Sequence, residues 1–185
     1  MIRIFASLAA FAGCAAILSA QAIDPDTFKV NYLSHIRAND SAVYITNAGT
    51  TAQAELCADI YVFDPNQELS ECCSCQITPD GLLTLSGEDD LTANPLTGVY
   101  LNAATVKIVS SSTCDATKPA PASGIHAWAT HLEGGEMAGA IVETSFLDAG
   151  LSSAELTALG KQCKAIKTVG SGKGVCRCPP IESCD

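Results

Sequence analysis

Hydrophobic and polar residues alternate in several short segments of the chain, a pattern that predicts half-buried β-strands. The clearest example is 28–32, where Phe28, Val30 and Tyr32 occupy alternate positions. The other segments of this kind are 42–46, 56–63, 82–85, 105–109, 125–130 and 140–146. Turn-forming sequences follow 42–46 and 56–63, so we expect these two segments to form an antiparallel pair.

One later segment has helical spacing. Ser152-Ser153-Ala154-Glu155 matches the capping box that begins many helices. The hydrophobic positions that follow on one helical face are Leu156, Leu159, Cys163 and Ile166. We expect a helix over 153–167, destabilised by about 1 kcal/mol at Gly160 relative to alanine. The glycine-rich segment 170–174 then predicts a turn, followed by a final short strand that carries Cys176 and Cys178.

Many short strands and a single late helix predict a mainly β fold. The expected architecture is an antiparallel β-sandwich of the Greek-key, Ig-like type, with one α-helix in the C-terminal half of the chain. We expect disulfide bonds to cross-link this sandwich, because the chain is rich in cysteine.

The first 22 residues match a secretory signal peptide. Arg3 supplies a positive charge, 4–18 is apolar, and Ala20-Gln21-Ala22 has small residues at the positions that a signal peptidase reads. The apolar run is short for a membrane span. An alternative stays open, because Phe11-Ala12-Gly13-Cys14 resembles a bacterial lipobox and would place a lipid anchor on Cys14.

Cleavage after residue 22 leaves 163 of the 185 residues, the size of one ordinary domain. We expect a single domain over 23–185, in which 179–185 is a loose C-terminal tail. The removed segment contains one basic and no acidic residue, so the net charge changes from −10 to −11. This acidity argues against nucleic acid and anionic membranes as partners, and we expect no membrane span.

Nine cysteines remain after cleavage, and thiols of exported chains usually oxidise to disulfides. Eight cysteines can form four bridges in about a hundred ways, among which the sequence does not choose. The eight candidates are Cys57, Cys72, Cys73, Cys75, Cys114, Cys163, Cys176 and Cys178. The ninth, Cys184, is the one we expect to stay unpaired or to pair between chains, because chain termini fray.

The cysteine spacing also suggests a metal site as an alternative. Cys72-Cys73-Ser74-Cys75 contains a C-x-x-C and Cys176-Arg177-Cys178 a C-x-C, and together they could supply zinc thiolates. The spacing matches no standard zinc finger, so disulfides are favoured and we expect no metal or cofactor. A thioredoxin-like redox role is disfavoured because no βαβ unit is predicted.

The histidines do not form a recognisable catalytic motif. His126 and His131 are five residues apart, which places them on opposite faces of an extended strand. Trp128 lies between them, and we expect it to pack in the core or on a sheet face. The chain has no G-x-S-x-G sequence, which disfavours a serine hydrolase.

The acidic residues are the remaining candidates for chemistry. Glu133, Glu136 and Glu143 could include a glycosidase pair, although the sequence does not determine their separation. Asp64-Pro65-Asn66 with Glu68 offers alternating oxygen ligands of the kind that bind calcium. This segment lacks the central glycine of an EF-hand loop and is also an ordinary turn, so a solvated turn is favoured.

A resemblance is carried by three segments, 43–49 (VYITNAG), 56–64 (LCADIYVFD) and 71–75 (ECCSC). Together with 125–131 and 152–163, they resemble a group of secreted, cysteine-rich bacterial proteins that has no assigned function. The resemblance implies export, disulfides and a bacterial source, and it implies no activity or site.

These observations predict a secreted, non-catalytic structural or interaction protein of the cell exterior, located outside the cell, at its surface or in the periplasm. Its partners would be further copies of itself or other extracellular proteins. The alternative is a module that binds carbohydrate or another extracellular ligand through loops and exposed aromatic residues such as Tyr61, Tyr100 or Trp128. A carboxylate-dependent hydrolase is the third hypothesis.

Overall fold

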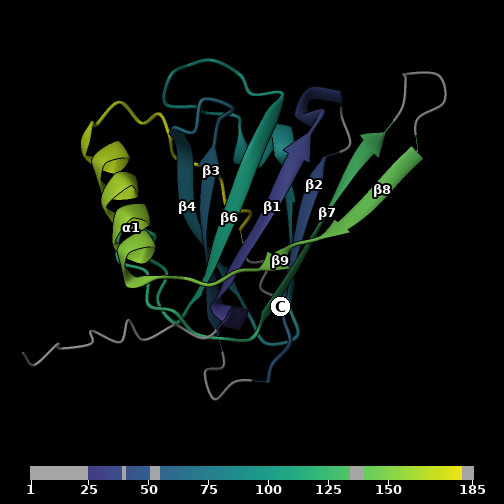
Figure 1. Cartoon of the computed structure of the whole chain (residues 1–185), viewed down its shortest axis with the longest axis vertical. Helices are drawn as coiled ribbons and strands as arrows, with labels where there is room; N and C mark the ends of the chain where they lie inside the picture. The colour runs from purple at the N-terminus through teal and green to yellow at the C-terminus, as the bar shows by residue number, and fades with distance from the viewer. Residues whose placement is uncertain (1–24, 39–40, 51–54, 134–139, 181–185) are drawn as a thin grey trace, which may run out of the picture.

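Two antiparallel β-sheets form the body of the protein in the computed structural model (Figure 1). The structure describes residues 25–38, 41–50, 55–133 and 140–180. One sheet has the strand order β4-β3-β6-β1-β9 and the other the order β5-β2-β7-β8. The expected signal peptide and Cys14 lie outside the described residues. The predicted mainly β sandwich is confirmed, whereas these strand orders do not confirm the Greek-key, Ig-like type.

The strands of the five-stranded sheet are β1 (Phe28–Ser34), β3 (Leu56–Phe63), β4 (Leu69–Ile77), β6 (Ala103–Ser111) and β9 (Leu147–Asp148). The strands of the four-stranded sheet are β2 (Ala42–Asn47), β5 (Leu82–Ser86), β7 (Ile125–Glu133) and β8 (Ala140–Ser145). The helical elements are η1 (Pro25–Thr27), η2 (Ile36–Ala38), η3 (Gly87–Leu91) and α1 (Ser153–Thr168).

The core lies between the two sheets and is filled by alternate residues of the strands. Val43 and Ile45 of β2 point into it from the four-stranded sheet, and Ile60 of β3 and Ile108 of β6 point into it from the other sheet; all four are fully buried. The residues between them on each strand face outward, which is the period-two pattern that the sequence predicts.

The helix begins and ends close to its predicted bounds. The Ser152 hydroxyl caps it by accepting a hydrogen bond from the Glu155 amide at 3.1 Å. The Glu155 carboxylate does not return to Ser152 as in a complete capping box, because it accepts from Lys107 Nζ of β6 at 2.6 Å. Only the Ser152 half of the predicted box is therefore present. The Glu155 carboxylate instead ties α1 to the five-stranded sheet.

Gly160 allows α1 to approach a neighbouring loop closely. A Cβ atom at this position would lie 2.8 Å from the Thr117 carbonyl oxygen and 3.2 Å from a carbon of Pro119. The glycine that lowers the intrinsic stability of the helix thus permits its contact with the segment 112–122. We name this segment the 112–122 loop.

The alternation pattern did not predict β4. This strand has buried residues on both faces: Cys73, Cys75 and Ile77 face the core between the sheets, and Cys72 faces α1. When both faces of a strand are covered, the contrast between its polar and apolar positions is lost. The small cysteine side chains on both faces of β4 weaken the alternation of polar and apolar residues further.

The predicted pairing of 42–46 with 56–63 is wrong. β2 pairs with β5 and β7, whereas β3 pairs with β4 and β6 in the other sheet. The chain therefore changes sheets between β2 and β3. Turn-forming residues between two strands are equally compatible with such a crossing and with a hairpin, so they could not distinguish the two.

The predicted final strand around Cys176 and Cys178 is also wrong. The described residues 175–180 form one isolated parallel bridge, between Val175 and Cys72 of β4, and no strand. The two prolines at 179 and 180 lack the amide hydrogens that an extended ladder needs. Disulfide bonds hold this segment in place of a ladder.

Candidate functional site: a cysteine cluster and an open sheet face

All eight cysteines expected to form disulfides are paired. The bonds are Cys57–Cys114, Cys72–Cys163, Cys73–Cys176 and Cys75–Cys178. Cys184 lies outside the described residues, so its state stays a prediction. These four bonds are consistent with an extracellular protein.

The adjacent cysteines Cys72 and Cys73 attach two different segments to opposite faces of β4. Because successive side chains of a strand point to opposite faces, Cys72 reaches Cys163 of α1 on the outer face. Cys73 reaches Cys176 on the face that looks into the sandwich. A single dipeptide thus anchors both the helix and the C-terminal segment.

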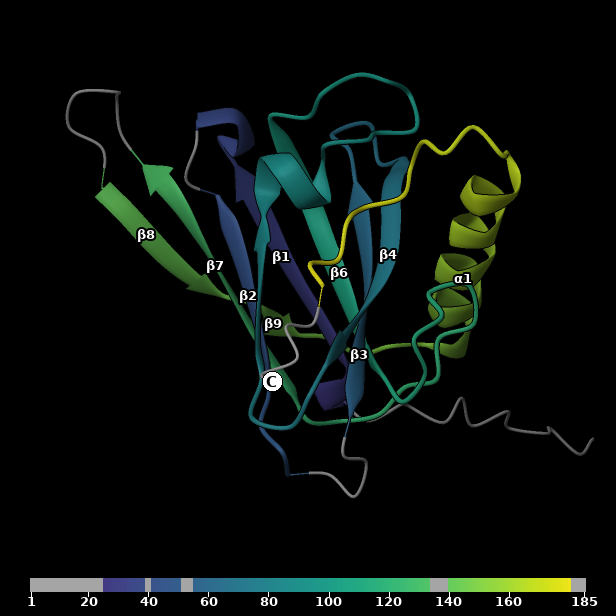
Figure 2. The ribbon, with the colours of Figure 1, turned by 180° about the vertical axis from the view of Figure 1, so that it is seen from behind.

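The C-terminal segment 174–180 runs along β4 towards β5, as Figure 2 shows from behind. The Cys72 amide donates to the Gly174 carbonyl at 2.9 Å, and the Arg177 amide donates to the Asp90 carbonyl at 3.0 Å. Further along, Pro179 and Pro180 border a groove of about 680 Å³ at the end of β4 and beside β5. The segment therefore closes part of the gap between the edges of the two sheets.

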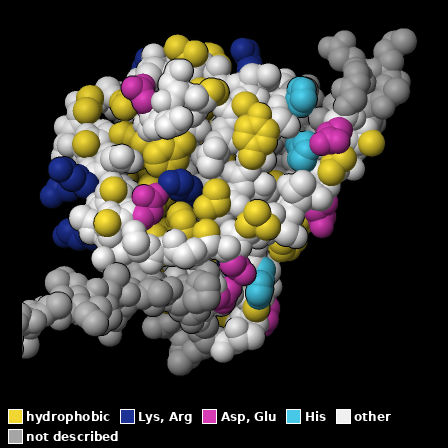
Figure 3. Space-filling view, in the orientation of Figure 1, with side chains coloured by type: hydrophobic (Ala, Val, Ile, Leu, Met, Phe, Trp, Pro, Cys, Tyr) yellow, Lys and Arg dark blue, Asp and Glu magenta, His cyan; other side chains and the backbone are white. Residues whose placement is uncertain are grey.

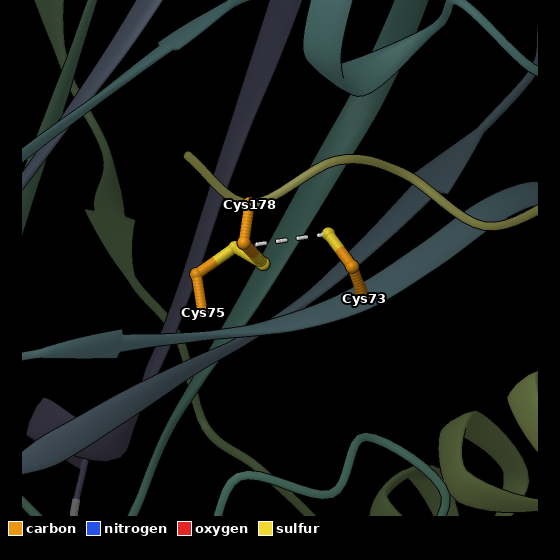
Figure 4. Close-up of side chains that lie close together, drawn as sticks. All are labelled: Cys73, Cys75 and Cys178. Carbon is orange, nitrogen blue, oxygen red and sulfur yellow. Dashed lines mark hydrogen bonds between the residues drawn. A yellow bond between two sulfur atoms is a disulfide. The ribbon is translucent and has the colours of Figure 1, made fainter. Parts of the chain in front are cut away.

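Three sulfur atoms gather where this segment meets β4. The sulfurs of Cys73, Cys75 and Cys178 lie within 4.8 Å of one another, and those of Cys73 and Cys75 are 4.0 Å apart. Figure 4 shows Cys75 and Cys178 joined by their disulfide, with the Cys73 sulfur beside it. The Cys176 sulfur is bonded to that of Cys73, so a fourth sulfur adjoins these three. We name these residues the cysteine quartet.

A buried acid lies beside the cysteine quartet. Glu71 of β4 is fully buried, and its Oε1 accepts a hydrogen bond from the Asn94 amide at 3.0 Å. Burial raises the pKa of its carboxyl to about 8, although the Asn94 amide and the charge of Arg177 act in the opposite direction. The neutral acid is therefore favoured near pH 7.

A second buried acid lies on the outer face of the five-stranded sheet. Asp59 of β3 is fully buried and accepts a hydrogen bond from the Ser74 hydroxyl at 2.5 Å. Burial raises the pKa of its carboxyl to about 7, opposed by hydrogen bonds from Ser74 and Ser111. The negative Asp115 raises this pKa further and the positive Lys167 lowers it. Its position under the 112–122 loop points to a structural role.

The outer face of the four-stranded sheet carries an aromatic pair. Tyr44 of β2 and Trp128 of β7 are directly opposite in the ladder, and their rings are 5.9 Å apart at an interplanar angle of 17°. The expectation that Trp128 packs on a sheet face is confirmed. Within the described part of the chain α1 is the only α-helix, and it packs on the other sheet.

A pocket of about 240 Å³ lies next to Trp128, where the chain leaves β8 and crosses to β9. The Phe146 amide donates to the Ala127 carbonyl at 3.0 Å. After this bond the chain passes to β9, so β8 does not pair with the first residues of β7. Polar residues around Trp128 in this pocket are His126, Glu143, Ser145, Asp148 and Lys29. We name Tyr44, Trp128, His126, Glu143 and Ser145 the aromatic face.

The floor of this pocket contains an ion-paired lysine. Lys29 of β1 is 3% exposed, and its Nζ lies 2.6 Å from Asp148 Oδ1 and 3.0 Å from Asp26 Oδ1. Two carboxylates therefore offset the charge of a buried ammonium group, as such burial requires. The ion pair joins β1 to β9, and both of its residues line the pocket.

The two histidines of β7 lie on opposite faces, as predicted. His126 is exposed beside Trp128, whereas His131 is buried and its Nε2 lies 3.2 Å from Glu133 Oε1. They share no site.

Three aromatic residues were expected in exposed positions, and for Tyr61 this prediction is wrong. It is fully buried under the 112–122 loop, where its hydroxyl donates to the Ala116 carbonyl at 2.8 Å. Tyr100 is 61% exposed and borders a groove of about 290 Å³. The alternation pattern alone could not distinguish the covered outer face of β3 from the open outer face of β7.

The acidic candidates do not form a catalytic pair among the described residues. Glu133 is opposite Ala140 and Glu143 is opposite Thr130, so these two carboxylates lie on different faces of the β7–β8 ladder. Glu136 lies outside the described residues. Asp64 Oδ1 accepts hydrogen bonds from the amides of Asn66 and Glu68, both at 2.9 Å, which confirms an ordinary turn.

A further apolar area is exposed on the outer face of the five-stranded sheet. Figure 3 shows hydrophobic side chains on this face between α1 and β1. Tyr32 of β1 is 59% exposed and Leu147 of β9 is 73% exposed. α1 therefore covers only part of this sheet.

Comparison with protein-family models, with curated proteins and with solved structures finds no match. Among the described residues, no helix is long and apolar enough to cross a membrane.

Proposed function

We propose that the protein is a secreted, non-catalytic interaction protein of the cell exterior, which makes its contacts through the aromatic face. The signal-peptide pattern of 1–22 and the four disulfides support export. The net charge of −10 favours solubility and disfavours anionic partners.

The observation that carries the proposed contact surface is the Tyr44–Trp128 pair beside the pocket. Aromatic side chains supply large contact areas, and ligand sites combine them with a few convergent polar groups. Here the polar groups are the carboxylate of Glu143, the imidazole of His126 and the hydroxyl of Ser145. The same sheet carries no helix on this side among the residues described.

The ligand class that fits this face best is carbohydrate. The apolar face of a sugar ring packs against an aromatic side chain, while its hydroxyl groups pair with carboxylate, imidazole and hydroxyl groups. The aromatic face offers these groups together at one end of β7. The proposal therefore joins the two leading sequence hypotheses, an interaction protein and a carbohydrate-binding module.

Glycan-array screening followed by calorimetry on the best ligand tests this function. We expect Trp128→Ala to weaken binding by about tenfold or more, as truncation of an aromatic contact at the centre of an interface typically does. Tyr32→Ala is the matched control, because Tyr32 is an exposed aromatic residue on the other sheet. Its affinity should stay within about twofold of wild type.

Two results would contradict the proposed surface. Equal losses in Trp128→Ala and Tyr32→Ala would show that neither face is specific. A loss in Tyr100→Ala with unchanged binding in Trp128→Ala would move the site to the groove beside Tyr100. If the wild-type protein binds no glycan, carbohydrate is excluded as the ligand class.

Self-assembly is the second candidate function, and the edge strand β8 favours it. β8 pairs with β7 on one side only, and Ile141 on this strand is 67% exposed. An unprotected edge strand can add a strand from another chain. Cys184 offers an independent covalent route, as the sequence predicts.

Sizing chromatography with and without reductant separates these two routes. Dimers that disappear with reductant indicate pairing through Cys184, whereas dimers that persist and are lost in Ile141→Lys indicate the β8 edge. Leu147→Lys is the control, since Leu147 is 73% exposed and lies on the other sheet. A monomer under all conditions argues against self-assembly.

A further inference from the structure

The cysteine quartet offers four sulfur ligands of the type that hold structural zinc, once its two disulfides are reduced. Structural zinc is held by four ligands in a tetrahedron, and thiolates bind it at about 2.3 Å, which places neighbouring sulfurs about 3.8 Å apart. The sulfurs of Cys73 and Cys75 are already 4.0 Å apart, and that of Cys178 lies within 4.8 Å of both.

In the disulfide-bonded structure, the backbone brings all four cysteines close together. Cys73 and Cys75 share the inner face of β4 because they are two residues apart on a strand. Their Cα atoms lie 5.2 and 5.3 Å from those of Cys176 and Cys178, respectively. Besides the disulfides, the C-terminal segment has two backbone contacts, the bridge between Val175 and Cys72 and the hydrogen bond from the Arg177 amide to Asp90.

The surroundings of the quartet also suit a bound metal. Cys73, Cys75 and Cys176 are at most 5% exposed, whereas Cys178 is exposed and leaves a route of entry. Four thiolates and one zinc ion carry a net charge of −2. Arg177, between the two C-terminal cysteines, supplies a positive charge, which acts on Glu71 of the same face of β4.

We propose that the reduced chain binds one zinc ion through Cys73, Cys75, Cys176 and Cys178. Two disulfides and one tetrathiolate zinc centre are then alternative cross-links between the same two segments. The C-terminal segment stays attached to β4 in both states, so a newly made chain can hold this part of its fold before oxidation. This inference does not depend on the ligand of the aromatic face.

The chemistry of the conversion balances with a phosphine as the reductant. Each disulfide accepts two electrons from one phosphine, which takes its oxygen atom from water to become the phosphine oxide, and two thiols form. Zinc then replaces the four thiol protons of the quartet, which are released to solvent.

The first experiment identifies the ligands in the wild-type protein. The purified protein is reduced with a water-soluble phosphine without oxygen, dialysed against zinc, and alkylated, and the unmodified cysteines are mapped by mass spectrometry. We expect one zinc ion per chain and protection of the cysteine quartet alone. Protection of another set of cysteines, or the same alkylation with and without zinc, would overturn the proposal.

The second experiment compares two variants that each remove one disulfide. Cys75→Ser/Cys178→Ser removes half of the quartet, and Cys57→Ser/Cys114→Ser removes a disulfide elsewhere. We expect zinc affinity to fall more than tenfold in the first variant and to stay within threefold in the second. Equal affinities in the two variants would refute the site. If the first variant does not fold, the mapping on wild-type protein still decides the question.

Discussion

The outer faces of the two sheets differ in what covers them. On the five-stranded sheet, α1 and the 112–122 loop bury Tyr61 and Asp59, and two disulfides hold this cover in place. On the four-stranded sheet, Trp128 and His126 face outward beside a pocket. The covered face contributes packing and cross-links, whereas the open face leaves Trp128 and the polar groups beside it accessible.

The largest expected effect comes from detaching α1, which together with the 112–122 loop forms the cover of the five-stranded sheet. With Cys73–Cys176 intact, the Cys72–Cys163 bond closes a loop of roughly 15 residues, for which chain entropy alone gives about 3 kcal/mol. Adding the lost packing of two buried sulfurs, we expect Cys72→Ala/Cys163→Ala to lower the free energy of unfolding by about 4 kcal/mol. Urea denaturation measures this, and a loss below about 1 kcal/mol would show that α1 is held mainly by packing.

A matched pair of leucines tests the two faces directly. Leu159 of α1 is 1% exposed under the cover, and Leu82 of β5 is 60% exposed on the other sheet. We expect Leu159→Ala to destabilise the protein by about 3 kcal/mol, because it leaves a cavity, and Leu82→Ala by less than about 0.5 kcal/mol. Similar midpoints in denaturant for the two variants would contradict the assignment of the covered face.

The smallest of these effects is a pH dependence that originates under the cover. The pKa of Asp59 is near 3.8 when exposed and about 7 in the folded protein, so the folded state holds a proton that the unfolded state has lost. The stability from this group is complete below about pH 3.8 and is lost as the pH rises to about 7. Between pH 5 and 7 we expect a loss of about 2 kcal/mol from this group.

The substitution Asp59→Asn should remove this contribution. Asp115 and Lys167 face Asp59 and remain in the variant, so the comparison isolates the Asp59 carboxyl. Glu143→Gln on the open face is the control and should keep the pH dependence of the wild type. Parallel stability curves for wild type and Asp59→Asn would show that the Asp59 carboxyl titrates normally.

The sequence predicted much of the fold and less of the candidate site. It located α1 from the Ser152 cap and the spacing of Leu159 and Cys163, and it placed Trp128 on a sheet face. It predicted neither the burial of Tyr61 nor the existence of β4. Both failures have one origin, because burial by a distant segment leaves no mark on the local alternation of residues.

The sequence by itself determined the features that depend on neighbours along the chain: most of the short strands, the capped helix, the signal-peptide pattern, and which eight cysteines pair. Only the tertiary structure decided the pairs themselves, the sheet to which each strand belongs, and the meeting of Cys73 and Cys75 with Cys176 and Cys178. The reason is physical. Periodicity and capping act over a few residues, whereas these contacts join residues about a hundred positions apart and depend on packing of the whole domain.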